Sequence, residues 1–490
     1  MCEGLKQARQ YEREGEKKIP KENRPVFHFS PPTGWMNDPN GFSRYKGEYH
    51  LFFQYHPYKA HWDTMYWGHA KSRDMIQWEY LPAALAPGNS YDSTGIFSGS
   101  ALEEGENQVL VYTGVEEGLL ENGKKRMVQS QCIALGDGRD YTKLLTNPVV
   151  RAELLPEGSS RKDFRDPKIW KEGNRYYMVV GSRAGDGSGQ IALFTAFSLE
   201  SWEFAGILDR SENQLGKMWE CPDFFPLEEK QVLLVSPQEM KARGLEFHNG
   251  HNAVFLLGNY EKEQFSFTRE KEQNVDYGLD FYAPQTMETE DGRRIMIGWM
   301  QSWDNFLYPK ELGWSGMMTI PRELSLKGDR VCQQPVRELL ACRKNPVSYR
   351  GVCPREEGEL EGIEGRCIDL ELSLQGNEYQ SFRLKLAADE EHYTEIIYDR
   401  DAQTLAFDRT CCGLTKDVIS TRRMQVKNKE LCSLRILLDR YSVEIFVNGG
   451  EQVMSSLIFT PERARGIRFA SEGEVELTVT KYDIVLEGPR

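Results

Sequence analysis

Three acidic residues stand inside short motifs that resemble one another in character. Asp38 lies in GWMNDPNG, Asp166 in DFRDPKIW and Glu220 in MWECPDFF, and each motif opens a strand-like apolar stretch. Asp-Pro-Asn-Gly alone is ordinary turn chemistry, because proline fixes φ and both asparagine and glycine accept positive φ. The bulky Trp35 and Met36 beside this turn, and the two further acid-centred motifs, indicate a functional site as well as a turn.

These acids suit the cleavage of a glycosidic bond. Carboxyl groups brought together repel one another unless their pKa values differ, and acid/base chemistry on a glycoside requires such a difference. The aromatic sequence neighbours of Glu220 predict a raised pKa and the role of general acid. Asp38 has turn N–H groups and the Asn37 amide nearby, which favour an ionised nucleophile. Asp166 follows Arg165, which predicts an anionic group that binds sugar hydroxyls and stabilises a cationic transition state.

Length and composition predict a two-domain globular protein with a small-molecule substrate. The chain has 490 residues, enough for two cores, and 28% are charged and 11% aromatic. A net charge of -14 argues against nucleic acid or an anionic membrane as the main partner. The first 25 residues lack an apolar signal-peptide core, and no run of 18 apolar residues occurs. We therefore expect a cytoplasmic enzyme with no membrane partner.

Neither a metal nor a cofactor is expected. The ten cysteines contain no CxxC pair, so we predict reduced, mostly buried thiols, the adjacent Cys411 and Cys412 included. His56, His61 and His69 match no standard ligand spacing, and no acid or thiol cluster accompanies them.

The acids need a scaffold that brings them together, and residues 25–325 supply a repeating one. This segment contains many short apolar strands bounded by Gly, Pro, Asn and Asp, with no long helical period. Asp38, Ser98, Asp166, Glu220 and Pro284 recur at intervals of about 60 residues, which suits four-stranded blades. The sequence therefore predicts a five-bladed β-propeller whose innermost strands direct the acids into one central funnel.

The remaining segments have other patterns. Residues 1–24 predict a helical extension, and residues 326–350 predict a linker of helical or irregular character. Residues 351–490 alternate apolar and polar side chains and contain the hairpin signal Asn448-Gly449, which predicts an antiparallel β-sandwich. The whole chain is thus expected to be all-β, and an exposed sandwich edge could support a homo-oligomer.

The ordered motifs HFSPPTGWMNDPNG, FSGSA, FRDP, WECPDFF and YAPQT resemble glycoside hydrolase family 32 from His28 to about Leu326, and VEIFVNGG resembles part of that family's C-terminal sandwich. The resemblance implies a propeller plus sandwich, and retaining hydrolysis of fructosides through a covalent fructosyl-enzyme. It places the nucleophile at Asp38, the acid/base at Glu220 and the transition-state stabiliser at Asp166. It also implies these substrate-binding residues: Asn37, Gln54, Trp62, Phe97, Ser98, Arg165, Tyr282 and Trp299.

Several functions remain open at this stage. We rank hydrolysis of terminal β-D-fructofuranosyl linkages in sucrose and short fructooligosaccharides first, and a sucrose-6-phosphate hydrolase second. For the latter, basic residues on the loop Gln238 to Phe247 could bind the phosphate. A fructan exo-hydrolase ranks lower, because a cytoplasmic enzyme would meet only small imported sugars. A non-catalytic sugar-binding propeller ranks lower, because all three acids stand inside full motifs. An inverting propeller enzyme would place its carboxyl groups about 6.5–9.5 Å apart, against about 5–5.5 Å for retention.

Overall fold

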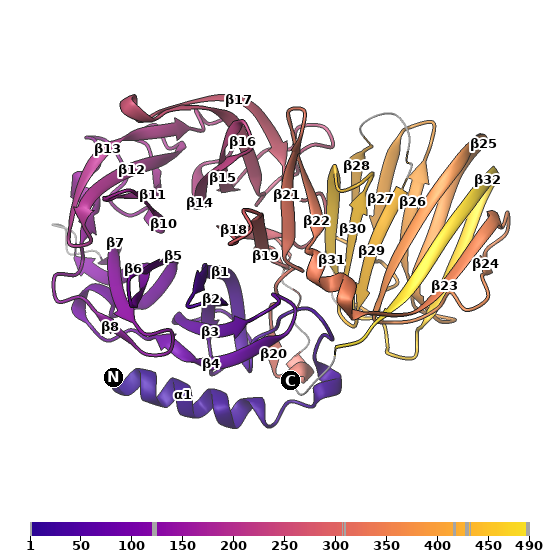
Figure 1. Ribbon diagram of the computed structural model, residues 1–490, viewed down its shortest axis with the longest axis horizontal. Helices are drawn as coiled ribbons and strands as arrows, with labels where there is room; N and C mark the ends of the chain where they lie inside the picture. The colour runs from indigo at the N-terminus through magenta and orange to yellow at the C-terminus, as the bar shows by residue number, and fades with distance from the viewer. Residues whose placement is uncertain are drawn as a thin grey trace.

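The protein consists of a five-bladed β-propeller and a C-terminal β-sandwich, side by side (Figure 1). The computed structural model describes residues 2–119, 125–305, 307, 310–414, 418–426, 431 and 433–486. The propeller and the sandwich confirm the predicted all-β fold class.

Each blade is an antiparallel sheet whose strands follow one another along the chain. The first contains β1 (Gly34–Tyr45), β2 (Glu48–His56), β3 (Tyr66–Ser72) and β4 (Trp78–Leu85). The second contains β5 (Gly95–Glu104), β6 (Asn107–Leu119), β7 (Lys125–Gly136), β8 (Tyr141–Lys143) and β9 (Val150–Arg151). The third contains β10 (Phe164–Glu172), β11 (Arg175–Arg183), β12 (Gly189–Ser198) and β13 (Ser201–Arg210).

The fourth and fifth blades complete the ring. The fourth contains β14 (Met218–Leu227), β15 (Lys230–Gln238), β16 (Val254–Glu261) and β17 (Ser266–Asn274), and the fifth contains β18 (Tyr282–Glu288), β19 (Arg294–Trp299), β21 (Arg322–Lys327) and β22 (Arg330–Pro335). Between β19 and β21, the short β20 (Trp314–Ser315) pairs in parallel with β1. This pairing ties the chain of the last blade back to the first.

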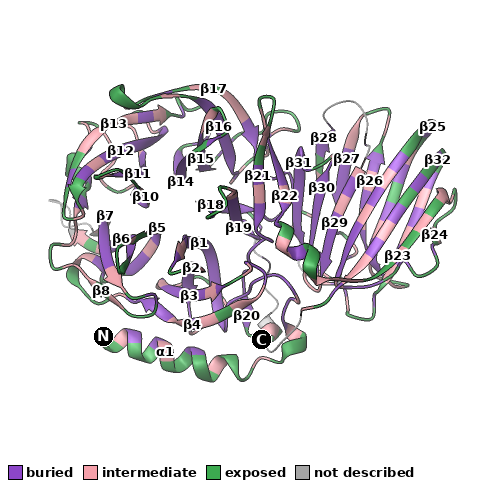
Figure 2. Ribbon diagram, in the orientation of Figure 1, coloured by how far each residue is buried: buried purple, intermediate pink, exposed green. Residues whose placement is uncertain are grey.

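The first strand of every blade lies nearest the centre of the ring (Figure 1). Strands such as β6 and β11 contain continuous runs of apolar residues, because neighbouring blades cover both faces of a blade. Val109 and Val111 of the second blade, for example, share a buried cluster with Phe164 and Met178 of the third. Figure 2 shows the same burial along the strands of the ring.

Helix α1 (Glu3–Glu16) lies against the outer strand of the first blade and contacts β4. Leu5, Ala8 and Glu12 form its buried face, at the three- and four-residue spacing of one helix side. Among the described residues, no helix has both the length and the apolar character needed to cross a membrane. The other helical segments that the structure describes are short 3-10 helices of three or six residues: η1 (Lys21–Asn23), η2 (Ser90–Asp92), η3 (Ala152–Leu154), η4 (Lys262–Gln264), η5 (Lys310–Leu312) and η6 (Arg337–Cys342).

The sandwich is built around two long strands, β25 (Ile368–Ala388) and β32 (Gly466–Ile484), which pair along most of their length. The first half of β25 also pairs with β29, and its second half with β26, so both layers share these strands. The other strands are β23 (Arg343–Val352), β24 (Gly358–Glu359), β26 (Thr394–Asp399), β27 (Thr404–Asp408), β28 (Thr421–Gln425), β29 (Ser433–Asp439), β30 (Ser442–Val447) and β31 (Gln452–Leu457).

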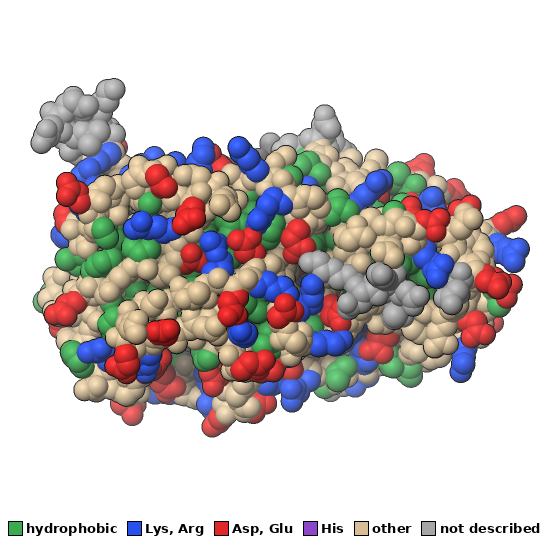
Figure 3. All heavy atoms as spheres, turned by 90° about the horizontal axis from the view of Figure 1, so that it is seen from above, with side chains coloured by type: hydrophobic (Ala, Val, Ile, Leu, Met, Phe, Trp, Pro, Cys, Tyr) green, Lys and Arg blue, Asp and Glu red, His purple; other side chains and the backbone are tan. Residues whose placement is uncertain are grey.

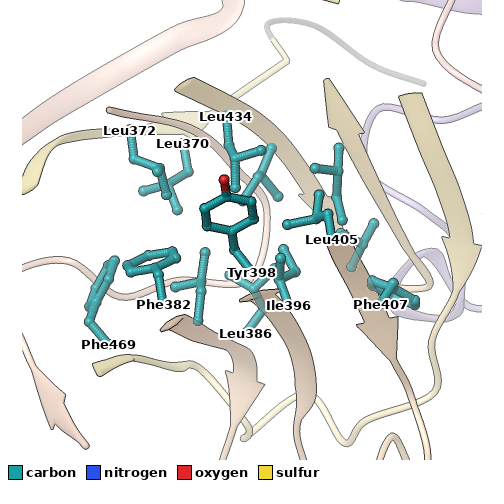
Figure 4. Close-up of a cluster of buried hydrophobic side chains, with 14 of the residues drawn as sticks. Leu370, Leu372, Phe382, Leu386, Ile396, Tyr398, Leu405, Phe407, Leu434 and Phe469 are labelled. Carbon is teal, nitrogen blue, oxygen red and sulfur yellow. The ribbon is translucent and has the colours of Figure 1, made fainter. Parts of the chain in front are cut away.

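Inward side chains of the sandwich strands form one apolar core. Figure 4 shows Tyr398 at its centre, with Phe382, Ile396, Leu405 and Leu434 around it. The alternation seen in the sequence places these side chains on the inner faces and the polar ones outside. Figure 3 shows that Lys and Arg side chains intermix with Asp and Glu over one face of the molecule.

The connection between the domains is shorter than predicted. Residues 330–335 pair with β21 as the outer strand of the fifth blade, and Arg343 already begins the sandwich. Only the segment around η6 links them, so the predicted linker 326–350 extended too far in both directions. The polar stretch QQP belongs to this strand: Gln333 is buried, and its side chain is hydrogen-bonded to Arg322 and to the carbonyl oxygen of Val275.

Buried charges join the two domains. Arg322 of β21 donates hydrogen bonds to Glu444 of β30 at 2.6 Å and to Asp276 at 3.1 Å. His28 lies between Glu444, at 2.8 Å, and Asp439, at 2.9 Å. All five side chains are fully buried, so the packing of the sandwich against the propeller fixes these pairs.

Candidate active site

The innermost strand of every blade carries an irregularity at the predicted site position. The pairing register shifts between Met36 and Pro39 in β1, and between Arg165 and Lys168 in β10. Equivalent shifts lie between the residue pairs Phe97/Gly99, Glu220/Asp223 and Tyr282/Gln285. Such bulges re-aim side chains that would otherwise alternate across the sheet. Two Asp-Pro pairs, one Cys-Pro pair and one Ala-Pro pair occupy four of these bulges, since proline cannot donate to the ladder.

Asp38 lies almost fully buried on β1, and the side chains of Asn37 and Ser98 donate hydrogen bonds to it. Asn37 Nδ2 donates to its Oδ1 at 3.0 Å, and Ser98 Oγ donates to its Oδ2 at 2.7 Å. Trp35 Nε1 in turn donates to Asn37 Oδ1 at 2.7 Å, which orients the amide. Burial and then the charge of Glu220 raise the pKa of Asp38, although these hydrogen bonds lower it.

Asp166 faces Asp38 across the thiol of Cys221. The backbone N–H of Cys221 donates to Asp166 Oδ2 at 3.0 Å, and its Sγ lies 3.6 Å from Asp166 Oδ2 and 3.5 Å from Asp38 Oδ2. Asp166 has a φ of 64°, and its own N–H donates to Thr113 Oγ1 at 2.9 Å. A left-handed conformation at this residue is costly, and the contacts from two neighbouring blades hold it.

Glu220 is surrounded by hydrogen-bond donors. Arg165 Nε donates to Oε1 at 2.9 Å, Gln238 Nε2 donates to Oε2 at 2.8 Å, and the Tyr282 hydroxyl lies 2.7 Å from Oε2. The apolar surroundings predicted for Glu220 are therefore wrong. Trp219 and Phe224 lie in a cluster behind the strand. Trp219 is the direct neighbour of Glu220 and faces the opposite side, and Phe224 follows the bulge between Glu220 and Asp223.

The role of Arg165 also differs from the prediction. Its guanidinium group pairs with Glu220 of the next blade, at 2.9 Å, and not with the adjacent Asp166. Burial and the charge of Glu220 raise the pKa of Asp166, and Arg165 lowers it by less than these raise it. The carboxyl group predicted to be held anionic by its sequence neighbour thus has a raised pKa.

The other predicted binding residues divide into those that line the site and those behind it. Phe97, Cys221 and Trp303 are partly buried against a cluster that contains Tyr282. Trp62 is 48% exposed, and its ring lies edge-on to Phe97 at a centroid distance of 6.5 Å. Trp62 therefore presents an open face at the rim, as a sugar platform requires.

Gln54 and Trp299 lie in less accessible positions. Gln54 is buried and donates to the carbonyl oxygen of Ile96 at 3.1 Å. Trp299 is 0% exposed and packs against Trp35 and Trp303, at centroid distances of 5.8 and 5.0 Å. The predicted sugar-platform role of Trp299 does not fit this burial; the half-buried Trp303 is the better placed ring.

The side chains of His56 and His69 contact other groups of the fold. His69 stacks on Phe52 and lies 2.9 Å from His50, and His56 lies 2.8 Å from the carbonyl oxygen of Thr64. Within the described ranges, no group of three His, Cys, Asp or Glu side chains is arranged to hold a metal ion. The nine cysteines of those ranges are free, and all but the exposed Cys2 are buried or half-buried; Cys432 lies outside them.

Sequence reasoning missed Gln238, and it drew nothing from Cys221. Gln238 ends β15 and pairs with Met218 near the start of β14, so its amide reaches Glu220 two residues away. The apolar stretch KQVLLVSPQ predicts a strand, and its antiparallel pairing with the strand of Glu220 could have identified its last residue as a partner. His251 was also missed: its ring lies edge-on to Tyr282 at 5.5 Å, and Asp304 holds its Nδ1 at 2.8 Å.

Comparison with known proteins gives a consistent family over nearly the whole chain. A model described as the N-terminal domain of glycosyl hydrolases family 32 matches residues 28–335, and one described as the family's C-terminal part matches residues 338–485. A sucrose-6-phosphate hydrolase of Zymomonas mobilis is 39% identical over 94% of this chain and 91% of its own length. A raffinose invertase of Escherichia coli is 36% identical, covering 93% of both chains.

Solved structures show the same architecture. A variant of a Bombyx mori β-fructofuranosidase of family 32, in complex with sucrose, superimposes with a TM-score of 0.86 and 33% identity over 99% of both chains. A sucrose-6-phosphate hydrolase of Lactobacillus gasseri superimposes with a TM-score of 0.85 and 26% identity, covering 97% of this chain and 96% of the other.

Proposed function

The chain belongs to glycoside hydrolase family 32, and from this premise we propose that it hydrolyses terminal β-D-fructofuranosyl linkages in sucrose and short fructooligosaccharides with retention of configuration. The proposal rests on the position of the three acids, which come from three blades. Cys221 contacts both Asp38 and Asp166, and Arg165, next to Asp166 in the sequence, pairs with Glu220. Two carboxyl groups with distinct partners supply the nucleophile and the acid that such a reaction needs.

In the first step, Asp38 attacks the anomeric carbon of the fructosyl unit. The bond to the leaving oxygen breaks, and Glu220 gives that oxygen its proton. Ser98 and Asn37 hold the Asp38 carboxylate in one orientation, because each donates to a different oxygen. The product of this step is a covalent fructosyl-enzyme and a free leaving-group sugar.

In the second step, Glu220 takes a proton from water, and the water oxygen displaces Asp38 from the anomeric carbon. Asp166 lies beside both reacting groups through Cys221, which suits it to bind fructose hydroxyls and to stabilise the positive charge of the transition state. Two inversions leave the fructose with its original anomeric configuration.

The test of this function combines rates with stereochemistry. Initial rates on sucrose, sucrose-6-phosphate, a short fructooligosaccharide and inulin define the substrate class, and time-resolved NMR of the first-formed fructose anomer defines the outcome. We expect the β anomer first and the lowest kcat/KM for inulin. Formation of the α anomer first would assign an inverting mechanism, and a preference for inulin would assign a fructan hydrolase.

A second candidate is a sucrose-6-phosphate hydrolase. The names of the relatives from Zymomonas mobilis and Lactobacillus gasseri support it. A cytoplasmic location would favour both candidates over a fructan hydrolase, since only small imported sugars would reach the enzyme. A preference of about a hundredfold in kcat/KM, worth about 2.7 kcal/mol of transition-state binding, would place the phosphorylated substrate first.

A further inference from the structure

The loop between β2 and β3, residues 57–65, carries the exposed Trp62 at the rim of the funnel. The base of this loop is closed by His56, whose Nδ1 lies 2.8 Å from the carbonyl oxygen of Thr64. On the funnel side, the ring of Trp62 lies edge-on to Phe97. These contacts shape the loop, but the position of Trp62 over the funnel also depends on what supports the loop from outside.

A cavity of about 530 Å³ borders the same loop. Its walls are formed by residues 58–61 of the loop, by the second half of α1 and by residues 311–313. His61 lines this cavity, whereas the ring of the next residue, Trp62, lies against Phe97, so the loop separates the cavity from the rim. A wall that faces a cavity lacks packing partners on that side. The loop therefore has room to move away from the funnel unless a specific contact holds it.

Tyr11 of α1 supplies such a contact. Its hydroxyl donates to the carbonyl oxygen of Tyr58 at 3.2 Å, and the two rings, which both line the cavity, meet edge-on at a centroid distance of 5.0 Å. The ring of Tyr58 also contacts His56 at the end of β2 and Tyr66 at the start of β3, at centroid distances of 5.6 and 6.0 Å. A contact made at Tyr58 thus reaches both ends of the loop.

The helix is anchored to the propeller on both sides of this tyrosine. Arg9 Nε donates to the carbonyl oxygen of Ala83 at 2.9 Å, and the N–H of Ala83 donates to Glu12 at 2.9 Å. One turn further along, Gly15 approaches Thr33 so closely that a Cβ at this position would lie 2.8 Å from the threonine side chain. The helix is therefore held against β4 and against the segment that leads into β1, which fixes the tyrosine in place.

We propose that Tyr11 is a positioning residue for the reaction: through Tyr58 it holds the loop that presents Trp62 to the substrate. Tyr11 itself touches no substrate. The inference rests on the proposed function and on the role of Trp62 as a sugar platform. A loop that is already held in its binding position loses less conformational entropy when a sugar binds, so the contribution of Tyr11 falls on affinity. Helix α1 is in this way part of the support of the active site.

Kinetics of Tyr11→Ala test the proposal, because alanine preserves the helix and removes both contacts to the loop. We expect KM for sucrose to rise about 3- to 10-fold with kcat nearly unchanged, as for a loss of uniform binding. Tyr11→Phe keeps the ring contact and should restore most of the affinity. Gln10→Ala is the control on the same helix, since the exposed Gln10 side chain donates to Glu14, and its KM should equal that of the wild type. An unchanged KM in Tyr11→Ala overturns the proposal.

A double-mutant cycle separates positioning from a general loss of stability. In a Trp62→Ala background, Tyr11→Ala should raise KM no further, because the group that it positions is gone. Hydrogen exchange in residues 57–65 should become faster in Tyr11→Ala and stay unchanged in Gln10→Ala. Equal effects of Tyr11→Ala in both backgrounds overturn the proposal, and so does a wild-type KM in Trp62→Ala alone. A wild-type chain that hydrolyses no fructoside would instead contradict the proposed function.

Discussion

At the scale of single residues, the three acids differ in the groups that donate hydrogen bonds to them. Asp38 accepts hydrogen bonds from a side-chain amide and a hydroxyl, and Asp166 accepts one from a backbone N–H. Glu220 accepts hydrogen bonds from an arginine, a side-chain amide and a tyrosine hydroxyl. The charge of Glu220 is one cause of the raised pKa of both aspartates. Both aspartates are therefore protonated more readily than a free carboxyl group would be, through burial and the negative charge of the neighbouring acid.

Replacing Asp38 by Asn should lower kcat on the order of 10³-fold or more, because the amide cannot form the fructosyl-enzyme. The fold should persist, since Asn can keep one oxygen as an acceptor for Ser98 or Asn37. Circular dichroism and the melting temperature check the fold, and sucrose hydrolysis checks activity. A well-folded variant with more than a few per cent of wild-type activity would remove Asp38 from the nucleophile role.

Replacing Glu220 by Gln should affect substrates unequally. We expect a loss of about 10²- to 10⁴-fold in kcat/KM on sucrose, whose leaving group needs a proton, and a much smaller loss on a fructoside with an activated leaving group. The wild-type rate on sucrose should have a bell-shaped pH profile that loses its alkaline limb in the variant. Equal losses on both substrates would mean that Glu220 does not protonate the leaving group.

At the scale of the elements, one irregularity repeated in five strands builds the site. A regular inner strand would direct alternate side chains into the two flanking blades. The bulges place Asp38, Asp166 and Glu220 on the funnel instead, and each bulged strand keeps its apolar outer part in the interblade cores. The end of β15 then adds Gln238, and the loop between β2 and β3 adds Trp62.

Helix α1 offers a pH test at the same scale. Its buried Glu12 accepts a hydrogen bond from the N–H of Ala83. Burial raises the pKa of Glu12 from 4.5 to about 7; the hydrogen bond and the charges of Arg9 and Arg13 lower it by less, and Glu16 adds to the rise. A carboxyl group with a raised folded pKa stabilises docking fully below pH 4.5, and this contribution is lost as the pH rises through about 7.

We therefore expect hydrogen exchange in α1 to become faster, relative to the propeller strands, between pH 5 and pH 8 after correction for the intrinsic rate. Glu12→Gln should remove most of this change, because it keeps an acceptor for Ala83 without a charge. Glu14→Gln is the control, since Glu14 lies on the exposed side of the helix. Identical profiles for wild type and Glu12→Gln would show that Glu12 does not control docking.

At the scale of the whole molecule, the domain interface depends on buried charges. Replacing Glu444 by Gln leaves Arg322 without its nearest counter-ion at 2.6 Å, and breaking such a pair costs about 3–5 kcal/mol. We expect a clear fall in the melting temperature, measured by calorimetry. Glu462→Gln should have little effect, because the ion pair of this exposed glutamate with Arg440, at 3.6 Å, is accessible to solvent. Similar melting temperatures for both variants would argue against a central role of the interface.

The same interface gives a pH dependence of stability. Burial alone would lower the pKa of His28, but hydrogen bonds to Asp439 and Glu444 raise it from 6.5 to about 9. A raised histidine pKa gives stability that is complete below pH 6.5 and is lost as the pH rises through about 9. The free energy of unfolding should therefore decrease over this range. His28→Gln should show a flatter profile; an equally steep profile would assign the decrease to other groups.

The sequence alone determined the acids, their order and the architecture that brings them together. The markers Asp38, Ser98, Asp166, Glu220 and Pro284 lie on the first strands of five successive blades, because each blade is built from consecutive residues. Local signals suffice for such a fold: short apolar strands, turn residues and their repeat. The strict alternation after residue 351 likewise predicted the sandwich, since a period of two places one face of each strand in its core.

Only the tertiary structure decided which groups meet at those positions. Arg165 pairs with Glu220 and not with Asp166, Trp299 is closed off behind Trp303, and Tyr11 of α1 contacts the loop that carries Trp62. Adjacent residues of a strand face opposite sides, so sequence neighbours are poor guides to the surroundings of a side chain. Contacts between blades, and between the propeller and the sandwich, follow from how the ring closes, which no local pattern encodes.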